Sequence, residues 1–209
     1  MHAGAPRIAR GCGVTTTAIL RADDGTPSAL HVDRWLDTPP REEQALLDRC
    51  VAPVLDVGCG PGRHALALAE RGQVVLGVDA APAAAGLARS RGVSVLQRSI
   101  FDRLPGEGRW ATALLLDGNI GIGGDAVRLL RRLRELLQPD GCVFAELAPP
   151  DVDSCVRQMR VESRGNASAW FAWAVVSATD IGEVADHAGF AVVEQWSAAR
   201  RWFVELRSQ

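Results

Sequence analysis

The sequence predicts a doubly wound α/β fold, in which helices cover both faces of a mostly parallel β-sheet. From residue 54 onward, short apolar runs alternate with stretches of helical periodicity, which is the order expected of successive β-α-β units. Several of these runs are nearly continuous, as in parallel strands that are buried on both faces. Near the C-terminus two strand-like runs lie only a few residues apart. That is too close for a parallel crossover, so they predict an antiparallel hairpin.

The expected elements follow one another regularly. Strands are expected at Val54–Val57, Val74–Val78, Val93–Leu96, Ala111–Leu116 and Cys142–Leu147. Helices fit between and after them at Arg63–Arg71, Pro82–Arg91, Asp125–Gln138 and Thr179–Ala188. The C-terminal hairpin is expected to pair Ala191–Trp196 with Trp202–Leu206.

The first 53 residues follow a less regular pattern. Thr15–Leu20 and Ala29–Val32 are predicted to pair as a hairpin across Asp23-Asp24-Gly25. A short helix is expected at Arg41–Cys50. Residues 1–13 show no pattern that predicts an element.

Composition limits the classes of function. At 209 residues and 47% hydrophobic, the chain can bury one good core. Its net charge of −2 disfavours a strong electrostatic footprint on nucleic acid. No apolar stretch is long enough to span a bilayer, and the first residues do not resemble a secretory signal. The cysteines form no C-x-x-C pair, so we expect a reducing, cytoplasmic setting and no metal framework. No membrane partner is expected either.

A glycine-rich loop stands where the first of these strands meets its helix. Gly58, Gly60 and Gly62 allow a tight turn whose backbone N–H groups lie beside the positive end of the helix. The next strand ends in Asp79, about 20 residues further on, where an acid can bind two ribose hydroxyls and repel a 2′-phosphate. Asp56, two residues before the loop, suits a cationic group better than a pyrophosphate. The pattern therefore predicts a nucleoside site.

Three segments carry a resemblance to a known family. "VLDVGCGPGR", "VVLGVDAAP" and "LLQPDGCVFAEL" resemble the class I S-adenosylmethionine-dependent methyltransferases, from Val54 to about Leu206. The resemblance implies a Rossmann-like seven-stranded sheet with an antiparallel last strand, and S-adenosyl-L-methionine as cofactor. It divides the chain into an N-terminal segment, residues 1–53, that serves as a lid, and a methyltransferase domain, residues 54–209. "LLLDGNIGIGGD" and "RWFVEL" resemble a bacterial subgroup whose substrate is not settled.

The resemblance also implies the residues of the cofactor site. These are Asp56, Gly58, Cys59, Gly60, Gly62, Asp79, Ala80, Ser99, Ile100, Asp117 and Gly118. The family commonly has an acid after the third strand that binds adenine, and this chain has Ser99 there. The adenine edge is therefore expected to meet the Ser99 hydroxyl and the Ile100 backbone, while Asp102 is expected to cap the following turn.

The acceptor is expected at the carboxyl ends of the strands, where ligands bind in such sheets. Asn119, Glu146 and Trp173 are the expected substrate-binding residues, and Gly121, Gly123 and Gly124 are expected to leave room for substrate. Methyl transfer mainly needs alignment of the two reactants, so no metal is required and no catalytic residue is assigned.

Other side chains stay open alternatives. Arg157 and Arg160 are candidates for binding an acidic acceptor or are simply solvated. His31 is a weak candidate for a base, and His64 is expected to cap the helix or lie at the surface.

Methylation of a small-molecule acceptor is the function these observations favour. A nucleic-acid methyltransferase is the first alternative, but its Asn/Asp-Pro-Pro-aromatic segment is replaced by Asp117-Gly118-Asn119-Ile120. A metal-dependent catechol-type enzyme needs an Asp-Asn pair where this chain has Glu146-Leu147. A non-catalytic cofactor-binding protein of the same fold is a further alternative. The sequence does not determine the oligomeric state.

Overall fold

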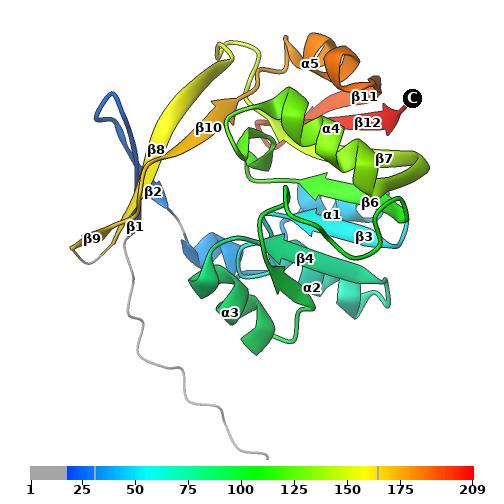
Figure 1. Cartoon of the computed structure of the whole chain (residues 1–209), viewed down its shortest axis with the longest axis horizontal. Helices are drawn as coiled ribbons and strands as arrows, with labels where there is room; N and C mark the ends of the chain where they lie inside the picture. Colours follow the sequence, from blue (N-terminus) through cyan, green and yellow to red (C-terminus); the bar gives the residue numbers. More distant parts are fainter. Residues whose placement is uncertain (1–17, 31, 164) are drawn as a thin grey trace, which may run out of the picture.

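A seven-stranded sheet forms the centre of the computed structural model, which describes residues 18–30, 32–163 and 165–209 (Figure 1). Its strands are β3 (Val54–Val57), β4 (Val75–Asp79), β5 (Val95–Gln97), β6 (Trp110–Leu115), β7 (Leu137–Leu147), β11 (Phe190–Ala198) and β12 (Arg201–Ser208). They lie in the order β11-β12-β7-β6-β3-β4-β5. Only β12 runs against its neighbours, since its pairs with β7 and β11 are antiparallel. The predicted fold class and C-terminal hairpin are thereby confirmed.

Helices cover both faces of this sheet. They are α1 (Arg41–Leu47), α2 (Arg63–Glu70), α3 (Pro82–Ser90), α4 (Ala126–Leu136) and α5 (Ile181–Ala188). Neighbouring residues of one strand serve opposite faces: Val54 packs with α1 and α2, while Leu55 packs in the cluster that contains α4 and α5. Burial on both faces is why the strands appear in the sequence as unbroken apolar runs.

A second, antiparallel sheet was not expected from the sequence. It contains β1 (Ala18–Ala22), β2 (Pro27–Leu30), β8 (Cys155–Ser163), β9 (Asn166–Ala167) and β10 (Phe171–Val175), in the order β10-β8-β1-β2 with β9 beside β8. The predicted N-terminal hairpin is present as β1 and β2, although Thr15 to Thr17 and His31 lie outside the described residues. Strand β1 pairs with β8 from Ala18–Ser163 to Ala22–Met159, so both sides of the predicted boundary at residue 53 contribute to one sheet.

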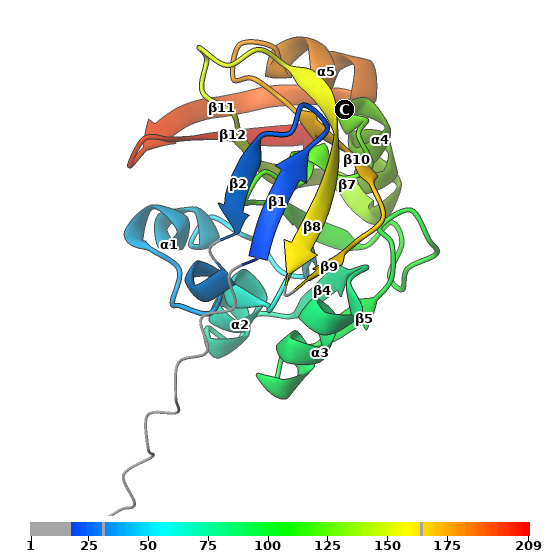
Figure 2. The same cartoon turned by 90° about the vertical axis from the view of Figure 1, so that its left-hand side faces the viewer.

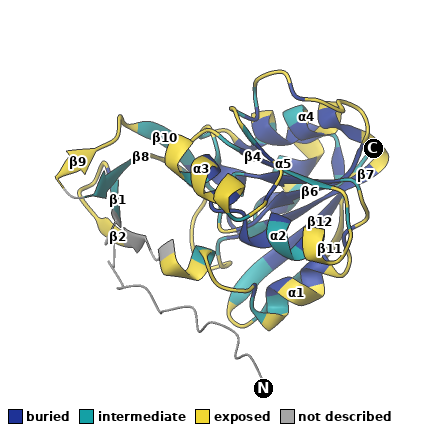
Figure 3. Ribbon diagram, turned by 90° about the horizontal axis from the view of Figure 1, so that it is seen from below, coloured by how far each residue is buried: buried dark blue, intermediate teal, exposed yellow. Residues whose placement is uncertain are grey.

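The second sheet stands beside the carboxyl ends of the parallel strands (Figures 1 and 2). It touches the central domain through β10, where Ile122 forms an isolated bridge with Trp173. Its strands are mostly half-buried or exposed, in contrast to the buried central sheet (Figure 3). The sheet therefore forms a wall over the edge at which α/β sheets bind their ligands.

Two smaller differences concern element boundaries. Helix α4 ends at Leu136, and β7 begins at Leu137 rather than at Cys142. A short 3-10 helix, η1 (Val32–Trp35), precedes α1, and another, η2 (Asn119–Gly121), follows β6. None of the helices in the described part of the chain is long and apolar enough to cross a membrane.

Candidate active site

The glycine loop links β3 to α2, and each of its three glycines has a positive φ, between 56° and 82°. Their surroundings differ. A Cβ on Gly58 would lie 2.8 Å from the side chain of Asn119, and a Cβ on Gly62 would lie 2.8 Å from Val93. A Cβ on Gly60 would have no atom within 4 Å, so this glycine faces open space. Gly58 and Gly62 thus serve packing, and Gly60 presents bare backbone outward.

Asp79 ties the loop to the end of β4. Its Oδ2 accepts a hydrogen bond from the Gly60 N–H at 2.8 Å, and its Oδ1 accepts one from the Ala81 N–H at 2.8 Å. A carboxylate has about four acceptor positions, so it keeps capacity for further donors. Ala80 is exposed beside it. Cys59 is buried against Gly77, and burial raises the pKa of its thiol.

Asp56 lies differently from the expected position at the amino end of the cofactor. Its side chain is 1% exposed, and its Oδ2 accepts the Ala65 N–H in the first turns of α2 at 3.1 Å. Burial raises the pKa of this carboxyl. A direct contact with a ligand would require the carboxylate to be uncovered, so in the structure it fastens the loop to the helix.

After β5, the Ser99 hydroxyl accepts the Phe101 N–H at 3.2 Å, and Asp102 accepts the Ser99 N–H at 3.2 Å. Asp102 therefore caps this turn, as expected. Ile100 is buried, and its carbonyl accepts a hydrogen bond from Arg132. The turn is thus held by its own residues and by Arg132 of α4.

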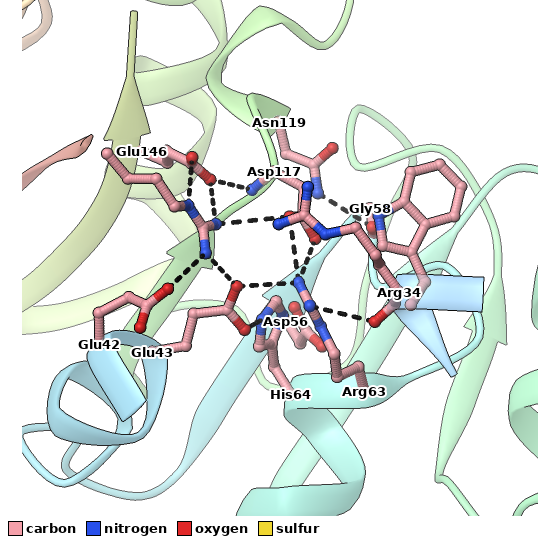
Figure 4. A network of polar contacts seen from close by, with 12 residues as sticks. Arg34, Glu42, Glu43, Asp56, Gly58, Arg63, His64, Asp117, Asn119 and Glu146 are labelled. Atoms are coloured by element: carbon pink, nitrogen blue, oxygen red, sulfur yellow. Dashed lines mark hydrogen bonds and ion pairs between the residues drawn. The ribbon is translucent and has the colours of Figure 1, made fainter. Parts of the chain in front are cut away.

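A network of charged side chains connects α1, α2, β7, β12 and the turn after β6 beside the loop (Figure 4). At its centre is Glu43 of α1, which is fully buried. It pairs with His64 at 2.8 Å, with Arg63 at 3.1 Å, and with Arg201. Burial opposes ionisation of Glu43, but hydrogen bonds and charges from His64, Arg201 and Arg63 outweigh it and lower its pKa to about 2. His64 is 4% exposed, so the expected surface role is wrong.

Arg201 joins this network because β12 is antiparallel to the other strands of the sheet. An antiparallel strand begins at the edge where the parallel strands end, so its first residue lies at the site. The guanidinium binds both oxygens of Glu146, at 2.7 and 2.6 Å, and also contacts Glu43. The turn before it places Ala199 and Arg200 at φ 50° and 63°, a left-handed conformation that costs free energy in residues with a Cβ. Sequence analysis did not find Arg201, although it noted "RWFVEL".

Asp117 lies in the turn after β6 in a strained conformation, with a φ of 55°. Arg63 donates to the two carboxylate oxygens of Asp117, at 2.8 and 3.0 Å. The backbone N–H of Asp117 donates to Glu146 Oε2 at 2.8 Å. Strain of this kind persists where the surroundings impose it, often at functional sites.

Asn119 and the neighbouring glycines depart from expectation. The Asn119 amide donates to the carbonyls of Val57 and Gly58, at 2.9 and 3.0 Å, so it supports the glycine loop. A Cβ on Gly121 would lie 2.1 Å from the Ala174 carbonyl, and one on Gly124 would lie 2.5 Å from Ala172. These two glycines therefore admit strand β10 rather than substrate.

The space beside Gly123 is also occupied by the protein itself, because the Phe101 ring lies 2.8 Å from the position that a Cβ on Gly123 would take. Gly118 behaves differently, since nothing lies within 4 Å of the corresponding point. Of these glycines after β6, Gly118 is therefore the one that leaves space for a substrate.

Gly118, Glu146 and Trp173 do meet, at a cavity of about 180 Å³. The rest of its lining is apolar and comprises Ile120, Leu147, Ala148, Ala174, Val175 and Val176. The candidate arginines are engaged elsewhere: Arg157 pairs with Asp24 at 3.6 Å, and Arg160 pairs with Glu162 at 2.5 Å. Glu146 and Trp173, two of the three expected substrate-binding residues, thus line one cavity.

The strand order, the reversed β12 and the glycine loop with Asp79 define the class of fold. The chain has the fold of the class I S-adenosylmethionine-dependent methyltransferases. Residues 54–141 match a family model described as a methyltransferase domain.

Solved structures show the same fold. An S-adenosylmethionine-dependent methyltransferase from Bacteroides fragilis, in complex with S-adenosyl-L-homocysteine, has a TM-score of 0.79 and 22% identity, over 92% of this chain and 88% of that one. The Burkholderia thailandensis 1,6-didemethyltoxoflavin-N1-methyltransferase has a TM-score of 0.62 and 24% identity, over 85% and 82%. The CcbJ methyltransferase from Streptomyces caelestis has a TM-score of 0.62 and 19% identity, over 83% and 92%.

Proposed function

We propose that the chain transfers a methyl group from S-adenosylmethionine to a small-molecule acceptor, at the cavity beside Gly118, Glu146 and Trp173. The observation that carries the proposal is the contrast within the glycine loop, where Gly60 alone of its three glycines faces open space. The structure of the Burkholderia thailandensis methyltransferase has 1,6-didemethyltoxoflavin bound beside S-adenosylhomocysteine, and that agrees with a small-molecule acceptor. A cytoplasmic setting without nucleic-acid or membrane partners is part of the proposal.

The residues at the loop fit this cofactor. Gly60 allows its methionine part to approach the backbone, and Asp79 keeps acceptor capacity for the ribose hydroxyls. The Nε–H of Arg63 is buried without a hydrogen-bond partner, and it suits the carboxylate of a methionine group. When bound, the cofactor supplies an electrophilic methyl group on a sulfonium.

We assign the adenine part to the turn at Ser99 and Ile100, and the methyl end to Asp117 and Gly118. Asp56 and Cys59 act in this proposal from beneath the loop, through the hydrogen bond to Ala65 and through packing. Excluding water favours the transfer because charge disperses as the methyl group moves.

Residues 1–53 act as a lid in this proposal. Two arginines support it by holding the segment before α1 next to the glycine loop. Arg91 donates to the carbonyls of Trp35, Leu36 and Pro61, at 3.3, 2.9 and 2.9 Å. Arg63 donates to the Arg34 carbonyl at 3.2 Å. Pro61 belongs to the glycine loop, so the Arg91 side chain binds both the lid segment and the loop.

Calorimetry with S-adenosylmethionine tests the proposal. Gly60→Val should abolish binding, because its side chain would occupy the space at the loop. Gly72→Val is the matched control: Gly72 also has a positive φ, 77°, and open surroundings, but it lies before β4 at the opposite edge of the sheet. Equal affinity of both variants for the cofactor would refute the proposed site.

A further inference from the structure

We infer that the acceptor is a small amine whose apolar part is about the size of one six-membered ring, an inference that rests on the proposed methyltransferase function. The volume of the cavity is about 180 Å³. A protein cavity of about 150 Å³ already admits benzene. Trp173 contributes a flat surface, and Ile120, Leu147 and Val176 supply apolar contacts. One ring therefore fits, and a larger scaffold would have to extend out of the cavity.

The charge of the cavity selects against anions. Of the residues that the structure describes, Glu146 is the charged side chain in its lining. Asp117 adjoins it, with a side chain that is 26% exposed and an N–H bonded to Glu146. Carboxylate oxygens accept hydrogen bonds and attract cations, so an N–H donor is favoured over a second carboxylate.

The nearby guanidinium groups do not reverse this preference. Arg201 is 13% exposed and spends its donors on Glu146 and Glu43, and Arg63 is 4% exposed and pairs with Asp117. In this network four carboxylates, those of Glu42, Glu43, Asp117 and Glu146, outnumber the basic groups, which are the guanidinium groups of Arg63 and Arg201 and the imidazole of His64. An acidic acceptor would thus meet excess negative charge.

An amine is also the group that the transfer can use directly. The acceptor nitrogen forms the N–CH₃ bond with its lone pair, and the C–S bond breaks with its electron pair left on sulfur. One proton passes from nitrogen to solvent, before the attack for an ammonium acceptor or after it for a neutral amine. No oxidant or metal enters the balance.

Three probes with the same ring and different charge test the inference: benzylamine, benzyl alcohol and benzoate. Binding is measured on the protein labelled with ¹⁵N, from the shift of the Trp173 indole N–H, which is assigned by its loss in Trp173→Phe. Trp170→Phe is the matched control, since Trp170 lies on the same segment, is 45% exposed and is outside the lining. Benzylamine should have the highest affinity of the three probes. Benzoate should bind up to about tenfold more weakly than benzylamine.

Glu146→Gln should remove the preference for benzylamine over benzoate. The inference is overturned if benzoate binds as well as benzylamine, or if no probe shifts the Trp173 signal. The comparison of probes on the unmodified protein decides the matter even if Glu146→Gln fails to fold. Calorimetry with S-adenosylhomocysteine is run in parallel. Loss of cofactor binding with the amine preference intact would refute the proposed function and leave the cavity's selectivity standing.

Discussion

The cofactor side and the acceptor side of the site are built in different ways. The cofactor side is made within one β-α-β unit, from a glycine loop and the acid that ends the next strand, joined by the hydrogen bond from Gly60 to Asp79. The acceptor side is made of residues from η2, β7, β10 and β12, which are far apart in the sequence. Backbone therefore shapes the first half, and ion pairs and packing shape the second.

If the acceptor side depends on ion pairs, removing one should cost more stability than any change at the loop. Arg201→Met leaves the buried Glu43 and the half-buried Glu146 without their shared partner, and breaking a buried pair costs about 3–5 kcal/mol. The free energy of unfolding in urea measures it. Arg207→Met on the same strand is the control. Arg207 is 49% exposed, and surface pairs contribute about 0–1 kcal/mol. Equal losses in both variants would contradict the central role of Arg201.

The cofactor side should respond in affinity instead. Asp79→Ala removes the acceptor for Gly60 and, by the proposal, for the ribose, so cofactor binding should weaken by roughly 1.5–3 kcal/mol. Calorimetry checks it, with Asp48→Ala as control, because Asp48 is 70% exposed and pairs with Arg71 just beyond the end of α2. An unchanged affinity in Asp79→Ala would show that the ribose lies elsewhere.

The same division explains what could be predicted from the sequence. Strand β3, the loop and Asp79 follow one another in the chain, so local patterns predicted them. The second sheet could not be predicted, because β8 carries charges at Arg157, Arg160 and Glu162 and its partner β1 comes from the other end of the chain. Arg201 was missed for a similar reason. Its role depends on the reversed direction of β12 and not on its sequence neighbours.

Some residues were correctly predicted to lie at the site, but their contacts in the structure differ from the predicted ones. Asn119 was expected at the substrate, and its residue type and position after β6 were correct. Its amide nevertheless bonds to the carbonyls of Val57 and Gly58, a contact that depends on how η2 packs against the loop. Gly121 and Gly124 likewise were correctly seen as small for a reason, but β10 is what they accommodate.

The charge network should make stability depend on pH in one direction. The pKa of Glu43 is about 2 in the fold and 4.5 ordinarily, so its stabilisation is complete above pH 4.5 and is lost as the pH falls toward 2. The slope approaches about 1.4 kcal/mol per pH unit in that window. Urea unfolding between these pH values measures it, and Glu43→Gln should flatten the slope. A slope that persists in the variant would assign the acid sensitivity to other carboxyl groups.

The smallest expected effect separates the two sides most finely. Asn119→Ala removes the amide donor to the Val57 and Gly58 carbonyls, so it should weaken cofactor binding by about 1 kcal/mol, the contribution of one ordinary hydrogen bond. Trp173→Phe keeps a ring at the cavity wall and has no contact with the loop, so it should leave the cofactor affinity unchanged. Both are measured by calorimetry with S-adenosylhomocysteine. If Trp173→Phe weakened cofactor binding as much as Asn119→Ala, the two halves would be coupled through η2, where Trp173 lies against Gly121. The division between a backbone-built cofactor side and a side-chain-built acceptor side would then fail at that contact.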